Sequence, residues 1–309
     1  MVSVSMVVDL GGIRMRNPLN TASGTYGNGW QFEGFYDVGA TMGAITCKGV
    51  AAEPWNGNPA PRLAELPGAA IMNSVGLQNP GVRTFVAEYG EYLQSVRDRG
   101  CQVICQVAGH SIEEYVRAIE LYEELASFAS GFEINISCPN IAAGGAAMGA
   151  TPTAAAEVMA ALRPRSERPL VVKMAPHDVA ESGRALESEG ADALSLINTI
   201  PGMAIDVRTR RSRLARATAG VSGPAIHAIA VRMVWECAQA VEIPICGIGG
   251  VASGEDAAEM ILAGATAVSI GTANMYDPTC APRILAELEE WVSSQGVSDV
   301  NELIGAFEC

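Results

Sequence analysis

The sequence contains almost no lysine, although it is not short of basic residues. Of its 20 basic side chains, 18 are arginine, and the two lysines are Lys48 and Lys173. Each stands in or at the end of an apolar, strand-like segment. Lysine carries a compact charge whose pKa shifts readily on burial, whereas arginine stays charged. We therefore treat both as candidate functional residues and regard chance survival of two lysines as the weaker explanation.

Features typical of membrane, secreted and metal-binding proteins are also missing. No apolar run approaches the roughly 18 residues of a membrane span, and the first residues lack the basic region and cleavage site of a signal peptide. The eight cysteines form no C-x-x-C pair, which disfavours disulfides and zinc or iron–sulfur sites. A net charge of −14 disfavours nucleic acid and anionic membranes as partners. We expect a cytoplasmic protein without a metal site.

What the sequence does contain is a regular alternation of strand-like and helix-like segments. The expected strands span residues 19–23, 44–48, 102–107, 132–137, 170–174, 193–198, 244–247 and 267–271. The expected helices span residues 31–39, 81–98, 111–127, 153–162, 178–189, 224–240, 254–263 and 282–294. This pattern predicts an α/β protein, a single (β/α)8 TIM barrel domain over residues 1–309. A doubly wound open sheet is the alternative, but polar residues at nearly every strand end favour the closed barrel.

Three stretches lie outside this repeat. Gly11 and Gly12 between two short apolar runs predict an N-terminal hairpin. Residues 49–80 and 199–223 are too long for ordinary connections, and the proline-rich first one predicts a small hairpin over the C-terminal mouth of the barrel. The second connection carries five arginines, Arg208, Arg210, Arg211, Arg213 and Arg216. It is either a solvated loop or a docking site for a partner subunit or for an acidic patch on a neighbouring copy.

The most informative strand end reads Asn-Ile-Ser-Cys-Pro-Asn over residues 135–140. α/β barrels and open α/β sheets place their chemistry at the carboxyl ends of the strands. Cys138 is the best candidate base, since the three histidines, His110, His177 and His227, stand in no motif. A free thiol has a pKa of ~8.5, so such a base is only partly active at neutral pH.

Amide and lysine side chains suggest what is bound. Asn73, Asn135, Asn140 and Asn198 follow different strand ends or loops, which indicates a ligand with paired donors and acceptors, such as a pyrimidine. The two lysines allow two chemistries. A cation beside a flavin stabilises its anionic reduced ring, whereas a lysine on a barrel strand can also form a Schiff base.

Glycines at the last two strand ends predict a phosphate site. These strands end in Gly247-Ile-Gly-Gly250 and Gly271-Thr272, and backbone N–H groups at such turns bind phosphate. Gly247, Gly249 and Ala252 also fit the dinucleotide fingerprint. That fingerprint needs an acidic residue closing the next strand, which here ends in Ser-Ile-Gly-Thr. The phosphate of a mononucleotide is the better interpretation.

On its motifs the chain resembles the catalytic subunits of class 1 dihydroorotate dehydrogenases, and more closely the 1B type. The resemblance covers essentially all 309 residues. It rests on Ala22-Ser-Gly24, Lys48, Gly57-Asn-Pro59, Asn73-x-x-Gly-Leu-Gln-Asn-Pro-Gly81, Asn135-Ile-Ser-Cys-Pro-Asn140 with Gly144-Gly145, Val172-Lys173, Ile197-Asn-Thr199, Val221-Ser-Gly-Pro-Ala225, Gly249-Gly250 and Gly271-Thr-Ala273.

The resemblance implies FMN inside the barrel mouth, with dihydroorotate or orotate stacked on its ring. Cys138 would remove the C5 proton while hydride leaves C6 for flavin N5. Gln106 departs from the asparagine usual in the family. The implied FMN contacts are Ser23, Lys48, Gly49, Gln106, Asn135, Lys173, Ile197, Gly223, Gly249, Gly250, Gly271 and Thr272. The implied pyrimidine contacts are Lys48, Asn73, Ser74, Val75, Gly76, Leu77, Asn135, Asn198 and Thr199.

The resemblance also implies partners. In the 1B type, electrons pass from FMN to a second subunit with FAD and a [2Fe-2S] cluster, which reduces NAD; a homodimer of catalytic subunits would sit inside a heterotetramer. Three alternatives stay open: a fumarate-linked 1A enzyme, another flavin barrel that oxidises dihydropyrimidines, and a Schiff-base lyase or catalytically silent phosphate-binding barrel. Asn140 argues against the second, whose loop tends to read Cys-Pro-His.

Overall fold

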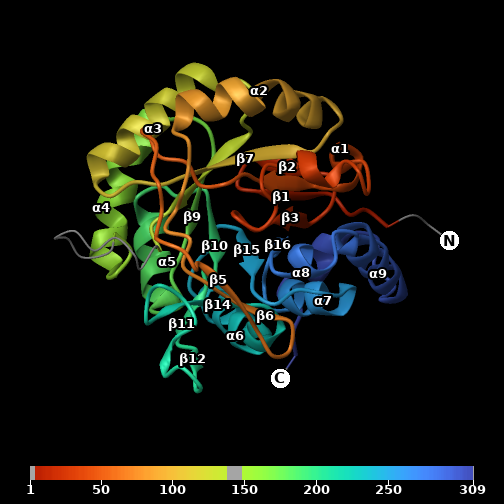
Figure 1. Ribbon diagram of the computed structural model, residues 1–309. Coiled ribbons are helices and arrows are strands. Elements are labelled where there is room, and N and C mark those ends of the chain that lie inside the picture. Colours follow the sequence, from red (N-terminus) through yellow and green to blue (C-terminus); the bar gives the residue numbers. More distant parts are fainter. Residues whose placement is uncertain (1–3, 138–147, 309) are drawn as a thin grey trace.

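A sheet of eight parallel strands forms the centre of the molecule (Figure 1). The computed structural model describes residues 4–137 and 148–308. The strand order is β3-β16-β15-β10-β9-β8-β7-β4. All eight predicted strands are present to within two residues of the expected bounds, so the predicted barrel is confirmed. The bounds are β3 Leu19–Thr21, β4 Ala44–Thr46, β7 Gln102–Val107, β8 Gly131–Asn135, β9 Leu170–Lys173, β10 Ala193–Leu196, β15 Ile245–Ile248 and β16 Ala267–Ile270.

The first and last strands of this order close the barrel through individual hydrogen bonds. The N–H of Gly43 donates to the carbonyl of Leu19 at 3.1 Å. Inside, the N–H of Thr46 donates to Thr21 Oγ1 at 3.0 Å, and Asn20 Nδ2 donates to Thr46 Oγ1 at 2.9 Å. These bonds join the edges of β3 and β4, although the two strands share no regular ladder.

Helices surround the outer face of the sheet (Figure 1), and side chains of the strands fill its inner face. Side-chain caps explain where several begin: Ser111, Thr151 and Ser253 accept hydrogen bonds from the N–H groups of Glu114, Ala154 and Asp256. The predicted helices from residue 81 onward are confirmed. The long ones are α2 Val82–Asp98, α3 Ile112–Leu125, α4 Pro152–Leu162, α5 Val179–Ser188, α6 His227–Ala238, α7 Gly254–Leu262 and α9 Cys280–Ser294, with the short α8 Ala273–Tyr276 between the last two.

The predicted helix over residues 31–39 is wrong. A 3-10 turn, η1 Trp30–Phe32, and a four-residue helix, α1 Val38–Thr41, replace it. Gly34 weakens a helix at the middle of the segment. Asp37 then defines a new start, because its side chain accepts the N–H of Ala40 at 2.8 Å. Three further 3-10 turns lie next to long helices. They are η2 Arg163–Arg165 after α4, η3 Pro224–Ile226 before α6, and η4 Val300–Leu303 after α9.

The predicted N-terminal hairpin is confirmed and closes the bottom of the barrel. It consists of β1 Val8–Leu10 and β2 Ile13–Met15, which pair antiparallel. Gly11 lies at φ +61°, and a Cβ there would come within 2.2 Å of the carbonyl oxygen of Asp192. The hairpin therefore packs directly against the segment that leads into β10, and its inward apolar side chains are buried.

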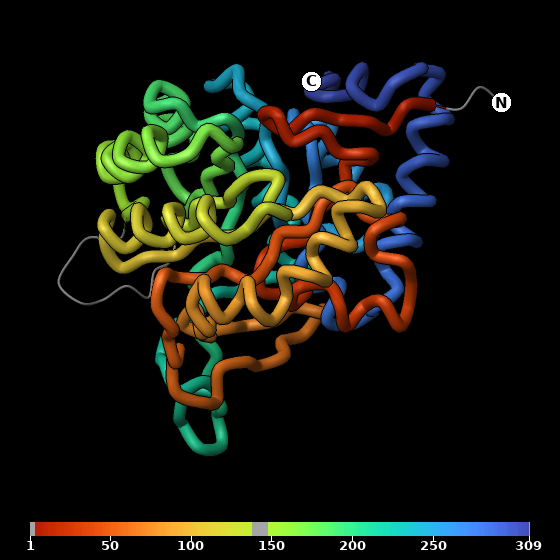
Figure 2. The backbone as a smooth tube through the Cα atoms, turned by 90° about the horizontal axis from the view of Figure 1, so that it is seen from above, coloured from red at the N-terminus to blue at the C-terminus, as the bar shows by residue number. Residues whose placement is uncertain are grey.

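The two long connections pair with each other above the mouth of the barrel. The first contains β5 Leu63–Leu66 and β6 Ala70–Asn73, the predicted hairpin. The second contributes β11 Ile200–Gly202 and β14 Ala219–Ser222, giving a four-stranded antiparallel sheet in the order β11-β14-β6-β5. Between β11 and β14 in the chain, β12 Ile205–Asp206 and β13 Arg211–Ser212 form a ribbon that projects beside the first connection (Figure 2).

Six cysteines behave as small apolar core residues. Cys47, Cys101, Cys105, Cys237, Cys246 and Cys280 are buried and free, as predicted, while Cys138 and Cys309 lie outside the described residues. Burial raises the pKa of Cys246 to about 11 and that of Cys237 to about 12, which leaves their thiols protonated and unreactive. No described helix is long and apolar enough to cross a membrane. Residues 4–137 and 148–308 contain no group of three His, Cys, Asp or Glu suited to a metal ion.

Candidate functional site

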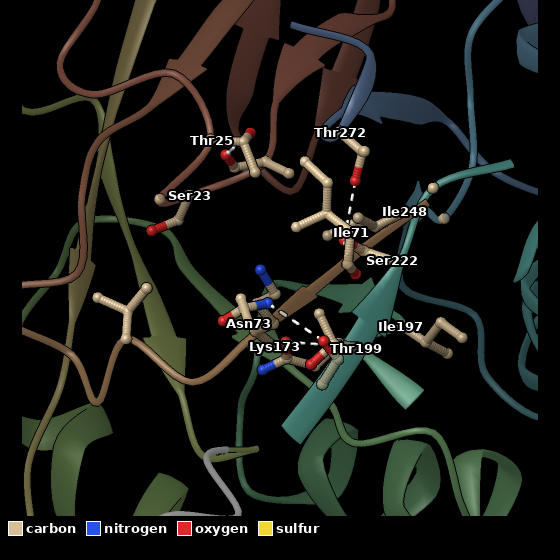
Figure 3. A pocket seen from close by; sticks show the side chains of 18 of the residues that line it. Ser23, Thr25, Ile71, Asn73, Lys173, Ile197, Thr199, Ser222, Ile248 and Thr272 are labelled. Atoms are coloured by element: carbon tan, nitrogen blue, oxygen red, sulfur yellow. Dashed lines mark hydrogen bonds between the residues drawn. The ribbon is translucent and has the colours of Figure 1, made fainter. Parts of the chain in front are cut away.

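A cavity lies between the carboxyl ends of the barrel strands and the four-stranded sheet above them (Figure 3). It holds about 1290 Å³ of empty space, its opening to solvent included. A concave site with apolar walls and a few polar groups is the usual form of a small-molecule site.

Most of the predicted site residues line this cavity. From the barrel strands and the loops after them come Ser23, Lys48, Gln106, Asn135, Lys173, Ile197, Asn198, Thr199, Gly249, Gly250, Gly271 and Thr272. From the sheet above and its flanks come Asn73, Val75, Gly76, Leu77 and Gly223. The predicted base, Cys138, and Asn140 lie outside the described residues.

Gly49 and Ser74 do not line the cavity. Ser74 is buried within its own loop, where its hydroxyl accepts from Asn58 Nδ2 at 2.9 Å and its N–H donates to the carbonyl of Arg62. Gly49 lies behind Gln106, and a Cβ there would meet Gln106 Oε1 at 2.4 Å. Gly49 thus allows Gln106 to reach the cavity floor.

The cavity also has walls that sequence reasoning missed. Leu63, Ile71, Gly220 and Ser222 face it from strands β5, β6 and β14. Pairing between the two long connections brings them there, and no local motif indicates that pairing. Thr272 Oγ1 donates to Ser222 Oγ at 2.8 Å, which joins the eighth strand end to the covering sheet (Figure 3). The remaining missed lining residues are Ala22, Gly24, Thr25, Ile226, Ile248 and Met275.

Lys173 brings a buried positive charge to the cavity. It is 5% exposed and lies opposite Asn135 in the register of β8 and β9. Its ammonium forms no hydrogen bond or ion pair with any residue in the described part of the chain. A buried cation without a partner is unfavourable, so this geometry calls for a ligand that carries negative charge or accepts hydrogen bonds.

The other end of the cavity presents unpaired backbone donors. Within residues 4–137 and 148–308, the N–H groups of Gly249, Gly250, Gly271 and Thr272 donate to no acceptor. Gly250 lies at φ +73°, and a Cβ there would come within 2.7 Å of the Cβ of His227. Gly249 and Thr272 are buried, and buried N–H groups are rarely left unsatisfied, so this loop pair is suited to an anion such as a phosphate.

A row of hydrogen-bonded amides lies along the floor of the cavity, at the end where Lys173 lies. Asn198 Nδ2 donates to Ser137 Oγ at 2.6 Å, and Ser137 Oγ donates to Asn135 Oδ1 at 2.9 Å. Asn135 Nδ2 points to Gln106 Oε1 at 3.4 Å, and Ser23 Oγ donates to the same oxygen at 2.8 Å. The histidines lie elsewhere: His110 and His177 are exposed, and His227 Nδ1 contacts the carbonyl of Gly249 behind the loop.

A family model described as dihydroorotate dehydrogenase matches residues 5–292. The chain belongs to the dihydroorotate dehydrogenase family. A protein of Geotalea daltonii named dihydroorotate dehydrogenase B (NAD(+)), catalytic subunit, is 46% identical over 310 residues, with 100% of both chains covered. A protein of the same name from Geobacter sulfurreducens is 46% identical over 303 residues, with 97% of each chain covered.

The fold of this family member also matches a solved structure. The crystal structure of DHODH in complex with ferulenol from Eimeria tenella aligns with a TM-score of 0.80, covering 98% of this chain and 88% of that one. At 22% identity this likeness shows the shared fold alone. Membership of the dihydroorotate dehydrogenase family makes the chain an oxidoreductase of a flavin-dependent class.

Proposed function

We propose that this chain oxidises dihydroorotate to orotate in pyrimidine biosynthesis, with FMN bound in a single barrel domain over residues 1–309. Family membership supports the reaction. The observation that carries the proposal is the two-ended cavity. One end has N–H groups without an acceptor in the described part of the chain, and the other has the Lys173 ammonium and the amides. A ligand with a phosphate and an electron-rich ring matches both ends.

The described residues fit FMN. The N–H groups of Gly249, Gly250, Gly271 and Thr272 would hold its phosphate, and Lys173 would lie beside the part of the ring that gains negative charge. Bound FMN supplies a hydride acceptor, which no side chain can provide. Ser23, Gln106 and Asn135 contribute the polar floor against which the ring would rest.

Asparagines would hold the substrate above that floor. Asn73 reaches the cavity from the covering sheet, and Thr199 from the segment after β10 (Figure 3). Asn198, next to Thr199 in the chain, also lines the cavity. Cys138 would remove the C5 proton of dihydroorotate. The thiol role is supported by the position of the three histidines, since none of them lines the cavity.

We further propose that electrons leave through a partner subunit that carries FAD and a [2Fe-2S] cluster and reduces NAD. The names of the relatives support a partner, because they describe catalytic subunits and include NAD. A cytoplasmic heterotetramer built on a homodimer of this chain is the assembly that follows. Both types oxidise dihydroorotate, and the electron acceptor distinguishes them: NAD, reached through this partner, in the proposed assembly, and fumarate in the 1A type.

The test uses the purified full-length chain. Its flavin is released, and its identity is determined by mass; FMN is expected. Dihydroorotate is then added without oxygen, and the visible absorbance of the oxidised flavin should disappear. A colourless protein, or a flavin that dihydroorotate does not bleach, would contradict the proposal. Trapping of Lys173 by borohydride in a colourless sample would instead support a Schiff-base lyase.

A further inference from the structure

A carboxylate is buried in the barrel below the cavity, where the mechanism above does not use it. Glu133 lies on β8, is 2% exposed and does not line the cavity. Gln106 Nε2 donates to one of its oxygens at 2.5 Å, and Ser195 Oγ donates to the other at 2.7 Å. Gln106 is also almost fully buried, so these bonds are shielded from water.

The carboxylate determines which way Gln106 points. A carboxylate only accepts hydrogen bonds, whereas an amide has a donating nitrogen and an accepting oxygen. The nitrogen of Gln106 must therefore face Glu133, and its oxygen must face the cavity. There Gln106 Oε1 accepts from Ser23 Oγ at 2.8 Å and faces Asn135 Nδ2 at 3.4 Å.

The same direction continues along the amide row. Asn135 has its nitrogen toward Gln106, so its oxygen is left to accept from Ser137 Oγ. Ser137 Oγ then accepts from Asn198 Nδ2, and Asn198 Oδ1 accepts the N–H of Thr199 at 2.8 Å. Every bond from Asn198 to Glu133 thus runs toward the carboxylate. Turning the row around would require a donor at position 133.

This direction decides what the floor offers to a ligand. Ser23 uses its only O–H on Gln106, so toward the cavity it can only accept. Asn135 and Asn198 each use one of two N–H groups in the row and keep the second as a donor. The resulting pattern, one acceptor beside two donors, matches rings that carry both N–H and C=O groups.

We propose that Glu133 is a positioning residue that sets the donor and acceptor pattern of the site through Gln106. The inference rests on the proposed function for the identity of the ligands. Without an acceptor-only group at position 133, the amides of Gln106 and Asn135 can turn over, because the Ser137 hydroxyl can accept from both of its neighbours, while the N–H of Thr199 still holds Asn198. Both orientations of Gln106 are then populated. Ligands that need one pattern then bind the correctly oriented fraction alone, which weakens their affinity.

The test compares two substitutions on the same carboxylate. Glu133→Gln keeps the shape but supplies both a donor and an acceptor. Ser195→Ala removes the other hydrogen bond of Glu133 and leaves Gln106 in place, so it reports the cost of disturbing this part of the core. Both are made in the full-length, FMN-loaded chain, and melting temperature serves as the measure of folding.

The readout is orotate affinity, titrated through the visible spectrum of the oxidised flavin. Glu133→Gln should raise the Kd for orotate about tenfold, which corresponds to about 1.4 kcal/mol, and Ser195→Ala should change it less than about twofold. In a Gln106→Leu background, Glu133→Gln should raise the Kd for orotate by less than about a further twofold, because the side chain that connects position 133 to the cavity is gone.

Three results would overturn the inference: an unchanged Kd in Glu133→Gln, an equal weakening in Ser195→Ala, or full additivity with Gln106→Leu. Each leaves the proposed function intact as long as the wild-type chain holds FMN and binds orotate. Failure of the wild-type chain to do so would instead overturn the proposed function, and with it the inference.

Discussion

At the scale of single residues, the ammonium of Lys173, which has no partner among the residues that the structure describes, makes the strongest demand on the ligand. Its charge is 5% exposed and faces the cavity. A cation held at this place stabilises negative charge on a reduced ring far more than it would in water, because the surroundings have a low dielectric constant.

Lys173→Ala should therefore lower the midpoint potential of the bound flavin and slow its reduction by dihydroorotate about 100-fold or more. Potentiometric titration and stopped-flow reduction measure the two effects. Lys173→Arg, which keeps the charge, should retain more of the potential than Lys173→Ala. Equal potentials in wild type and Lys173→Ala would show that the ammonium does not face the ring.

Cys138 leads to a second prediction at this scale, which rests on the sequence motif. Cys138→Ala should nearly abolish flavin reduction, and Cys138→Ser should leave a weak residual rate, because a hydroxyl is a poorer base. The wild-type rate should rise from pH 6 to about 9, as expected for a thiol with a pKa of ~8.5.

Cys246 provides the control. Burial raises the pKa of its thiol to about 11, and it lies on β15 inside the barrel. Cys246→Ala should leave the pH dependence of flavin reduction unchanged. Near-normal reduction in Cys138→Ala, or a flat pH profile in the wild-type chain, would exclude the thiol as the base.

At the scale of elements, α7 and α9 approach each other unusually closely. A Cβ on Gly254, the first residue of α7, would come within 2.4 Å of Glu287 Cβ and 2.6 Å of the backbone nitrogen of Leu288. The backbone of α9 would have to move to make room, because the nearest atoms are not the flexible end of a side chain. The position therefore requires glycine for reasons of space.

Gly254→Ala should destabilise the protein by about 1–3 kcal/mol, the usual cost of overpacking. Denaturant unfolding of the apoprotein measures it. Gly34→Ala is the matched control, since no atom lies within 4 Å of a Cβ there, and it should be neutral or slightly stabilising. Equal stabilities of the two variants would mean that α7 shifts without cost.

The same helix pair makes stability depend on pH. Glu287 accepts the N–H of Gly254 at 2.7 Å, and this bond, followed by the ion pair with Arg283, lowers the pKa of the Glu287 carboxyl. A carboxyl whose pKa is lowered by folding stabilises the protein above its unfolded pKa of about 4.3. That contribution disappears as the pH falls through the folded pKa.

Glu287→Gln should consequently lower the melting temperature at pH 7 and have little effect near pH 3. Because the side chain is 40% exposed, solvent screening limits the loss to about 1 kcal/mol or less. Thermal unfolding at several pH values measures it. If Glu287→Gln lowered the melting temperature equally at both pH values, the loss would come from packing and not from the carboxylate charge.

At the scale of the whole molecule, the arginine-rich ribbon contrasts with a chain of net charge −14. Arg208, Arg210, Arg211 and Arg213 are exposed on or beside the β12–β13 ribbon, which projects from the barrel (Figure 2). Such a patch can steer an acidic surface of a partner subunit into place, with an effect that weakens as salt rises.

Neutralising Arg210, Arg211 and Arg213 to glutamine should reduce complex formation with the FAD/iron–sulfur subunit and NAD-linked turnover by about tenfold at low salt. Flavin reduction by dihydroorotate in the isolated chain should not change, because none of the three lines the cavity. Unchanged binding and turnover would exclude the ribbon as the docking site.

The sequence by itself determined the barrel and most of the candidate site. Strand and helix periodicity are local properties, and eight repeats of them leave few topologies besides a closed parallel barrel. In such a barrel every strand end opens on one mouth, so motifs far apart in the chain, such as Lys48 and Gly249, were predicted to meet there, and both line the cavity.

The tertiary structure decided what depends on contacts between distant segments. Residues 31–39 form no continuous helix, because Gly34 and the Asp37 cap outweigh a weak helical pattern. The covering wall with Ser222 exists because β14 pairs with β6, a register that no local motif specifies. Glu133 looked like an ordinary strand residue, and only the barrel interior shows that it orients Gln106 beneath the cavity. Interactions between side chains on different strands depend on packing in three dimensions, which a linear pattern does not contain.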